Sequence, residues 1–160
     1  MTCLLSKPLN VKYRWCIRGL HRFGTLPSMQ RRELARAVIA MACARLALWM
    51  LPFRALRPLM FRLARATSSP RATTESAAIG NVAWALGVAA RTIPAATCLV
   101  RALAAQFLLG RHGIESTLRL GVMRAAGEFR AHAWVECRGR VVVGGDESPN
   151  VYCMLPRITW

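Results

Sequence analysis

The chain has 160 residues, of which 54% are hydrophobic, and this excludes an intrinsically disordered protein and is enough for the core of one domain. Its 23 Lys and Arg residues against 7 Asp and Glu give a formal net charge of +16. That surplus favours an anionic partner such as an acidic peptide, a nucleic acid or a membrane surface, although arginines on solvated helix faces explain it equally well. The 6 cysteines include no C-x-x-C pair and follow no secretory signal peptide, so we expect reduced thiols and a cytoplasmic location.

The first segment, residues 1–27, is basic and contains no acidic residue. Its apolar stretch after the first residues, Cys3-Leu4-Leu5, is too short for a signal peptide. We interpret 1–27 as a basic N-terminal extension, and 28–160 as the folded domain.

A long helix is predicted to begin at Pro27-Ser28, with Ser28 as its N-cap, and to end at Pro52. Residues 37–53 are apolar on nearly every face, so a membrane span has to be considered. Arg45 lies at the middle of this stretch, where an arginine costs about 2.5 to 3.5 kcal/mol on insertion scales. The uncharged pieces on either side are too short to span alone. We therefore expect a buried or partner-facing helix, and keep peripheral membrane contact open.

Two further helices are predicted over 53–66, with arginines on its surface, and over 75–91, separated by a loop of Ser, Thr and Pro residues. The apolar face of the second consists of Ile79, Val82, Ala83, Leu86 and Ala90.

The fourth predicted helix places a cysteine in its first turn. Thr97 is its expected N-cap, Cys98 follows directly, and His112-Gly113 ends it. The unpaired N–H groups and the helix dipole at this end stabilise a thiolate, and the same N–H groups can receive an oxyanion. A small buried cysteine without chemistry is the alternative interpretation of Cys98.

Beyond Gly113 the pattern alternates and predicts strands over 116–122, 129–137 and 140–144, with a loop over 123–128 and a turn at Arg138-Gly139. The predicted fold class is α+β, with helices first and then a small antiparallel sheet against which the helix of Cys98 packs.

The order of Cys98, His132 and Asp146 matches nucleophile, base and orienting acid. Asp146 is the single aspartate of the chain. Strict pairing across a two-residue turn places His132 opposite Gly145, with Asp146 on the wrong face. We therefore predict a one-residue register shift, through a three-residue loop 138–140 or a bulge at Gly144-Gly145, that brings Asp146 opposite His132.

A zinc site is the alternative function of the thiols and the imidazole, with Cys98, His132, Cys137 and Cys153 as its ligands. The spacing of these residues lacks the close pairs that are typical of structural zinc sites. We expect no metal and no cofactor.

Four segments together resemble a known family: Ala96-Thr97-Cys98-Leu99-Val100-Arg101-Ala102-Leu103, Leu108-Leu109-Gly110-Arg111-His112-Gly113-Ile114, Leu118-Arg119-Leu120-Gly121-Val122 and Ala131-His132-Ala133-Trp134-Val135-Glu136. In this order they are similar to the transglutaminase-like cysteine peptidase of lasso-peptide biosynthesis, the B-protein that removes the leader of the precursor. The helix ending at Trp49-Met50-Leu51-Pro52-Phe53-Arg54 also resembles the N-terminal part of that family.

The resemblance implies a transglutaminase-like or papain-like core over 28–160, with Cys98 as nucleophile, His132 as general acid and base, and Asp146 orienting His132. It implies a precursor peptide as substrate, a separate leader-recognition protein, since 1–27 is too short to be one, and an ATP-dependent lasso cyclase. The apolar N-terminal helices are a natural docking surface for such a partner. No GxxxxGK phosphate loop occurs here, so the ATP requirement belongs to the cyclase. We take the backbone N–H of Cys98 as the first candidate oxyanion donor, and Trp134 as a candidate wall of the site.

Two other function classes stay open. The first is a basic protein that binds nucleic acid or a membrane surface, supported by the arginine and aromatic mixture of 11–23. We do not expect nucleic acid as a partner of the peptidase. The second is a transglutaminase-type acyl transferase, in which an amine resolves the thioester in place of water.

Overall fold

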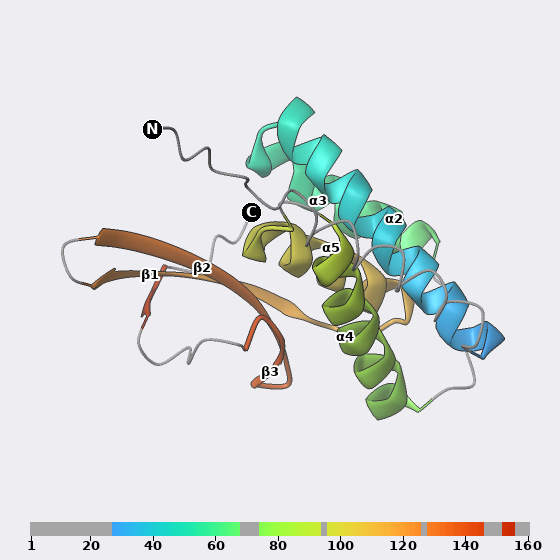
Figure 1. The fold of residues 1–160 in the computed structure, drawn as a ribbon. Helices are drawn as coiled ribbons and strands as arrows, with labels where there is room; N and C mark the ends of the chain where they lie inside the picture. The colour runs from blue at the N-terminus through green and yellow to red at the C-terminus, as the bar shows by residue number, and fades with distance from the viewer. Residues whose placement is uncertain (1–26, 68–73, 94–95, 126–127, 146–151, 156–160) are drawn as a thin grey trace, which may run out of the picture.

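The structure is a computed structural model that describes residues 27–67, 74–93, 96–125, 128–145 and 152–155. Helices α2 (Ser28–Met50), α3 (Phe53–Ala66), α4 (Glu75–Thr92) and α5 (Cys98–Arg111) precede strands β1 (Thr117–Ala125), β2 (Glu128–Cys137), β3 (Arg140–Val143) and β4 (Cys153–Met154). The helices gather on one side of the molecule, and the far end of the β1–β2 hairpin projects beyond them (Figure 1). This confirms the predicted α+β class. No helix in the described ranges has the length and hydropathy needed to cross a membrane.

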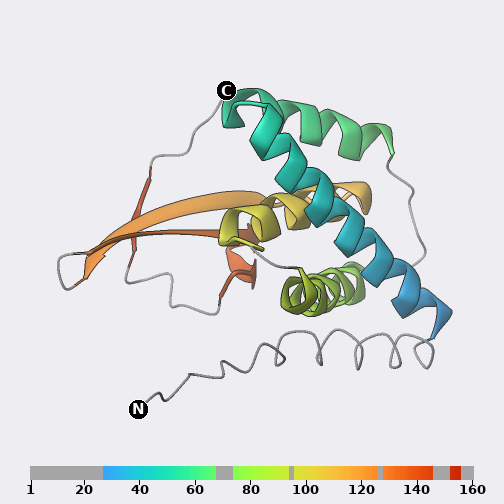
Figure 2. The same cartoon turned by 45° about the horizontal axis from the view of Figure 1, so that its top comes forward.

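Helix α5 is the central element of the fold. It packs against α2, α3 and α4 on one side and against β1, β2 and β3 on the other, and Figure 2 shows it between the sheet and α2. Its buried residues therefore surround the whole helix: Val100, Ala102, Leu103, Ala104, Ala105, Leu108 and Leu109. Small side chains allow the close packing, since a Cβ on Gly110 would lie 3.0 Å from the Cβ of Ala64 on α3. Helix α5 is thus held by packing on several sides, most closely against α3 at Gly110.

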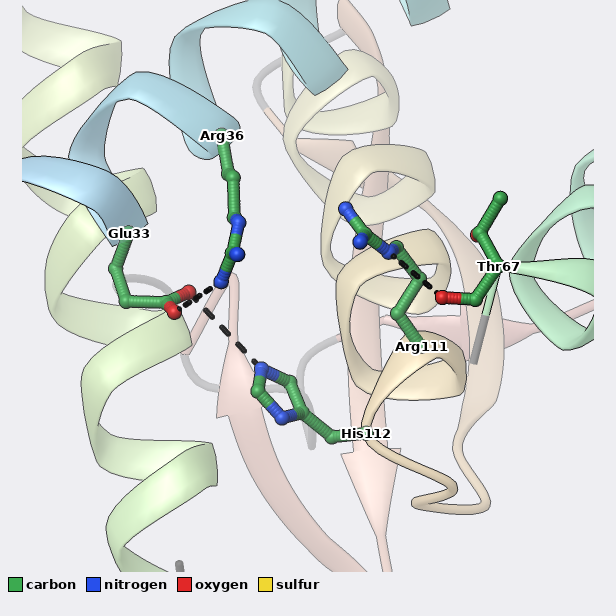
Figure 3. Close-up of polar contacts among 5 residues, drawn as sticks. All are labelled: Glu33, Arg36, Thr67, Arg111 and His112. Atoms are coloured by element: carbon green, nitrogen blue, oxygen red, sulfur yellow. Dashed lines mark hydrogen bonds and ion pairs between the residues drawn. The ribbon is translucent and has the colours of Figure 1, made fainter. Parts of the chain in front are cut away.

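Polar contacts also join α5 to α2 and α3 (Figure 3). Glu33 of α2 is buried, and its carboxylate lies 2.6 Å from Arg36 Nη1 and 4.0 Å from Nε2 of His112, the C-cap of α5. Arg111 Nε donates a 3.4 Å hydrogen bond to the carbonyl of Thr67, just past α3. The end of α5 is therefore held by a hydrogen bond and a polar contact as well as by packing.

The helix predictions need small corrections. Pro27, not Ser28, is the N-cap of α2, because the carbonyl of Pro27 accepts the first helical hydrogen bond, from Arg31 N, and Ser28 is already helical. Bounds of 53–66 for α3 are confirmed, and α4 runs one residue past the prediction. The buried face of α4 is rotated toward its alanines, so that Ile79, Ala83 and Ala90 are half-buried and the buried residues are Ala78, Val82, Ala85, Leu86 and Ala89.

The sheet is antiparallel, in the order β3-β2-β1-β4. Strand β1 continues to Ala125, which pairs with Glu128, so the predicted loop over 123–128 is wrong for most of its length. The composition of 123–125 suggested a loop, but pairing with β2 gives these residues the hydrogen bonds of a strand. Strand β4, which pairs with β1 at Gly121 and Val122, was not predicted. The turn at Arg138-Gly139 is confirmed, with φ of 49° and 75°, as a two-residue type I′ hairpin requires.

A one-residue register shift in the β2–β3 pair was predicted, and it is present. Cys137 pairs with Arg140 and Glu136 with Val141, but Val135 pairs with Val143. The shift therefore falls at Val142, between the two predicted positions, and the turn keeps two residues. Gly144 follows directly with φ of 85° and lies against Ala133 and Trp134 of β2.

Candidate active site

Cys98 is the first residue of α5, as predicted. Thr97 is the N-cap, and its side-chain oxygen accepts a 3.3 Å hydrogen bond from the backbone N–H of Val100. Cys98 itself is half-buried and packs against the core. Cys98 therefore belongs to the first turn of α5, whose unpaired N–H groups can stabilise an anion.

His132 lies on β2 and is held through one ring nitrogen. Its Nε2 is 2.7 Å from the carbonyl oxygen of Gly144. A carbonyl oxygen can only accept, so Nε2 carries the hydrogen and donates it. In the neutral imidazole this leaves Nδ1 as the nitrogen that can take a proton. The Gly144 contact thus selects the ring nitrogen that is available as a base.

Two aromatic rings contact the imidazole. The ring centroid of Tyr152 is 5.3 Å and that of Trp134 is 6.0 Å from the centroid of His132, both in stacked orientation. Trp134 and Tyr152 are buried. Gly121, opposite His132 on β1, makes room for them, because a Cβ there would lie 2.7 Å from Tyr152 Cβ and 2.9 Å from Trp134 Cζ3. The imidazole orientation is therefore fixed by packing as well as by its hydrogen bond.

Trp134 is itself held in place. Its Nε1–H donates to Glu136 Oε1 at 2.9 Å, and the other carboxylate oxygen accepts from Arg119 Nε at 3.0 Å. These residues share one face of the sheet with His132, as alternation along β2 predicts, while Ala133 and Val135 on the other face belong to the helix-covered core. Trp134 packs on the catalytic candidate, in agreement with its predicted place beside the site.

Two of the three predicted site residues, Cys98 and His132, lie in the described part of the structure. No hydrogen bond joins Cys98 to His132 within the described ranges, although α5 packs on β2. Asp146 lies outside the described residues, so its pairing with His132 stays a prediction. The shift at Val142 has the direction that this pairing requires.

The zinc alternative is not supported by the geometry. Among the residues that the structure describes, no group of three His, Cys, Asp or Glu side chains could hold a metal ion. Cys137 is buried in the helix-covered core, on the other face of β2 from His132. Burial, with a smaller contribution from Glu75, raises the pKa of the Cys137 thiol against the opposing effect of Arg138.

Gly144, Tyr152 and Gly121 were missed by the sequence analysis. Gly144 acts through its backbone carbonyl, which no side-chain pattern reveals, and Tyr152 adjoins a strand of two residues that is too short for periodicity. Gly121 had a usable signal, since an isolated glycine within a strand indicates a close approach of neighbouring atoms.

A comparison with protein families gives the class of the chain. The model of the Transglutaminase-like superfamily matches residues 38–154, from α2 to β4. The chain therefore belongs to the Transglutaminase-like superfamily, and its four helices and four-stranded antiparallel sheet are consistent with a transglutaminase-like core. Members of this superfamily are commonly cysteine hydrolases or transferases. Searches of curated proteins and of solved structures gave no match.

Proposed function

We propose that this protein is a cysteine peptidase that cleaves the leader from a lasso-peptide precursor. The observation that carries the proposal is the position of Cys98 as the first residue of α5, in the turn that stabilises a thiolate. His132 lies on β2, on the face opposite the helix-covered core, and its anchoring through Nε2 retains Nδ1 as a base. The superfamily match and the resemblance of the four sequence segments support the same chemistry. The folded domain proposed for it is 28–160, preceded by the basic extension 1–27.

In the proposed reaction, Nδ1 of His132 takes the proton of the Cys98 thiol, and the thiolate attacks the carbonyl carbon of the leader–core bond. The backbone N–H of Cys98 receives the oxyanion. As the carbon–nitrogen bond breaks, the imidazolium protonates the departing core amine, and a thioester to the leader remains. Water, deprotonated by Nδ1, then releases the leader as a carboxylic acid and restores the thiol. Asp146 is proposed to orient His132 together with the Gly144 carbonyl.

Three partners are proposed along with this reaction. The precursor peptide is the substrate, a separate leader-recognition protein presents it, and an ATP-dependent lasso cyclase joins the freed amine to an acidic side chain. The recognition protein is proposed because the resemblance to the lasso-peptide leader peptidases implies one. Equal cleavage rates with and without it would remove that part of the proposal.

The direct test is incubation with precursor and recognition protein, followed by mass spectrometry. We expect leader and core fragments whose masses sum to precursor plus one water, and no cleavage by Cys98→Ala. Exposed Cys43→Ala is the matched control and should cleave normally. Cleavage by Cys98→Ala at the wild-type rate would refute the assignment of the nucleophile.

A second test addresses the approach of His132 to Cys98. If the two side chains form an ion pair, iodoacetamide alkylates Cys98 even at about pH 6, and His132→Ala slows this reaction while Cys43 reacts as before. Unchanged alkylation of Cys98 in His132→Ala would mean that the imidazole does not activate the sulfur.

Acyl transfer is the second candidate function, because the superfamily includes transferases as well as hydrolases. The first half of the reaction is the same, but an amine attacks the thioester. The mass of the product separates the two outcomes. Hydrolysis adds water to the acyl group, whereas transfer joins the acyl group to the amine in place of ammonia or of the departing peptide.

A further inference from the structure

The outer face of α2 is apolar and exposed. At roughly 100° per residue, six exposed positions fall on one side of the helix and form what we call the outer α2 stripe: Ile39, Ala42, Cys43, Leu46, Trp49 and Met50. Trp49 is 87% exposed and Met50 75%. The opposite side of α2 holds its contacts with α4 and α5. The stripe is therefore separate from the surface that α2 uses for folding, and large apolar side chains on it face solvent.

Basic residues accompany the stripe. The same helical spacing places Arg45, which is exposed, along one edge of the stripe, and Arg36, whose Nη1 pairs with Glu33, along the other. Between Glu33 and Glu75 the sequence contains no acidic residue, but it contains Arg36, Arg45, Arg54, Arg57, Arg62, Arg65 and Arg71. The segment of the sequence that contains the stripe is therefore positively charged.

We propose that the outer α2 stripe docks on an anionic phospholipid bilayer. A helix that lies in the interface buries its apolar side chains at the acyl boundary and places its arginines among the lipid phosphates. The stripe from Ile39 to Met50 is about 18 Å long at 1.5 Å per residue, so it would lie along the surface and not cross it. This proposal does not depend on the peptidase activity.

The charge pattern favours a bilayer over two other occupants. A second copy of the chain would bring two arginine-edged stripes together without acidic residues from this segment to neutralise them. A nucleic acid would bind the arginines but would leave Trp49 and Met50 in water. A lipid surface satisfies both the apolar and the basic residues.

Flotation of the full chain with vesicles tests the proposal. We expect binding to vesicles of equal parts phosphatidylcholine and phosphatidylglycerol, little binding to phosphatidylcholine alone, and release at 1 M salt, where the screening length is only about 3 Å. Absence of binding to the phosphatidylglycerol vesicles would overturn the proposal.

Matched substitutions test the stripe itself. The double substitution Leu46→Ser with Trp49→Ser should weaken vesicle binding by about tenfold or more, because two apolar side chains lose their burial. Phe129→Ser removes another exposed aromatic, on β2, and should leave binding unchanged. All three positions are exposed, so thermal unfolding should be preserved in both variants. An equal effect of the two variants would overturn the assignment to α2.

Charge reversals complete the test. Arg45, at the edge of the stripe on α2, and Arg140 on β3 are both exposed, so Arg45→Glu and Arg140→Glu change the net charge equally. We expect the first to weaken binding more than the second. Equal weakening, or binding to duplex DNA as strong as to the vesicles, would indicate a general attraction to polyanions. Loss of a complex with the leader-recognition protein in the Leu46→Ser, Trp49→Ser variant, with vesicle binding intact, would assign the stripe to a protein partner instead.

Discussion

Replacing Gly144 by alanine tests how closely the chain after β3 approaches β2. A Cβ at this position would lie 2.8 Å from the carbonyl oxygen of Ala133 and 3.0 Å from Cα of Trp134, and φ is +85°. An L-residue in the left-handed region costs about 1–2 kcal/mol. Contact with backbone atoms, which cannot rotate away, adds roughly 1–3 kcal/mol, the range for overpacking. We therefore expect Gly144→Ala to lower the free energy of unfolding by about 2–5 kcal/mol.

Two other glycines separate these contributions. Gly139 also has a positive φ, of +75°, but a Cβ there meets nothing within 4 Å, so Gly139→Ala should lose only about 1–2 kcal/mol. At Gly145 the nearest contact is a side-chain atom, Val141 Cγ1 at 3.3 Å, and Gly145→Ala should lose at most about 0.5 kcal/mol.

Thermal and urea unfolding followed by circular dichroism measure these differences. At about 2–4 °C per kcal/mol for a chain of this size, Gly144→Ala should lower Tm by roughly 4 to 20 °C. Equal losses for Gly144→Ala and Gly139→Ala would refute the argument from close approach.

The same variant also tests the role of the Gly144 carbonyl. If this oxygen positions His132, its displacement should lower kcat for precursor cleavage more than Gly139→Ala does, at a temperature where both variants are folded. Equal kcat values would show that the carbonyl contributes only to stability.

Other predictions concern the core and its titratable groups. Leu103→Ala, at a fully buried position of α5, should lower the free energy of unfolding in urea by about 2–5 kcal/mol. Leu63→Ala, at an exposed position, should change it by no more than about 0.5 kcal/mol. Similar losses in the two variants would contradict the central place of α5. Because burial raises the pKa of Cys137, its alkylation in the native protein should be slower than that of exposed Cys43 and should accelerate as pH rises, which peptide mapping detects. The folded state then holds this proton to higher pH than the unfolded state, so stability falls as pH rises above the unfolded pKa, and Cys137→Ala should reduce that fall. Glu33→Gln removes the charge from a buried ion-pair group and should lose about 1–3 kcal/mol in urea unfolding; an unchanged midpoint would contradict a structural role for the carboxylate.

Local signals in the sequence were sufficient for the helices. Thr97 before Cys98 predicted the start of α5, and His112-Gly113 predicted its end, because capping depends on residues a few positions apart. Alternation along β2 correctly placed His132, Trp134 and Glu136 on one face. These predictions held because the interactions that decide them are close in the chain.

Contacts between distant segments could not be predicted in this way. Met123 was assigned to a loop, but its pairing with Arg130 extends β1. Tyr152 reaches His132 because β4 pairs with β1, and nothing in two residues of strand indicates that pairing. The register shift was inferred from what Asp146 would require, yet its position at Val142 depends on how β3 lies against β2.

Because of the extra residue at Val142, the number of residues in the β2–β3 hairpin affects how Gly144 approaches His132. Deleting one residue between the Arg138-Gly139 turn and Gly144 would make the β2–β3 ladder uniform, with Val143 still opposite Val135, but it would remove the local bend and twist that an extra residue gives its strand. The direction from which the Gly144 carbonyl approaches His132 would then change, even with every other side chain retained. Variation in this hairpin is therefore expected as substitutions that preserve the number of residues, and not as insertions or deletions.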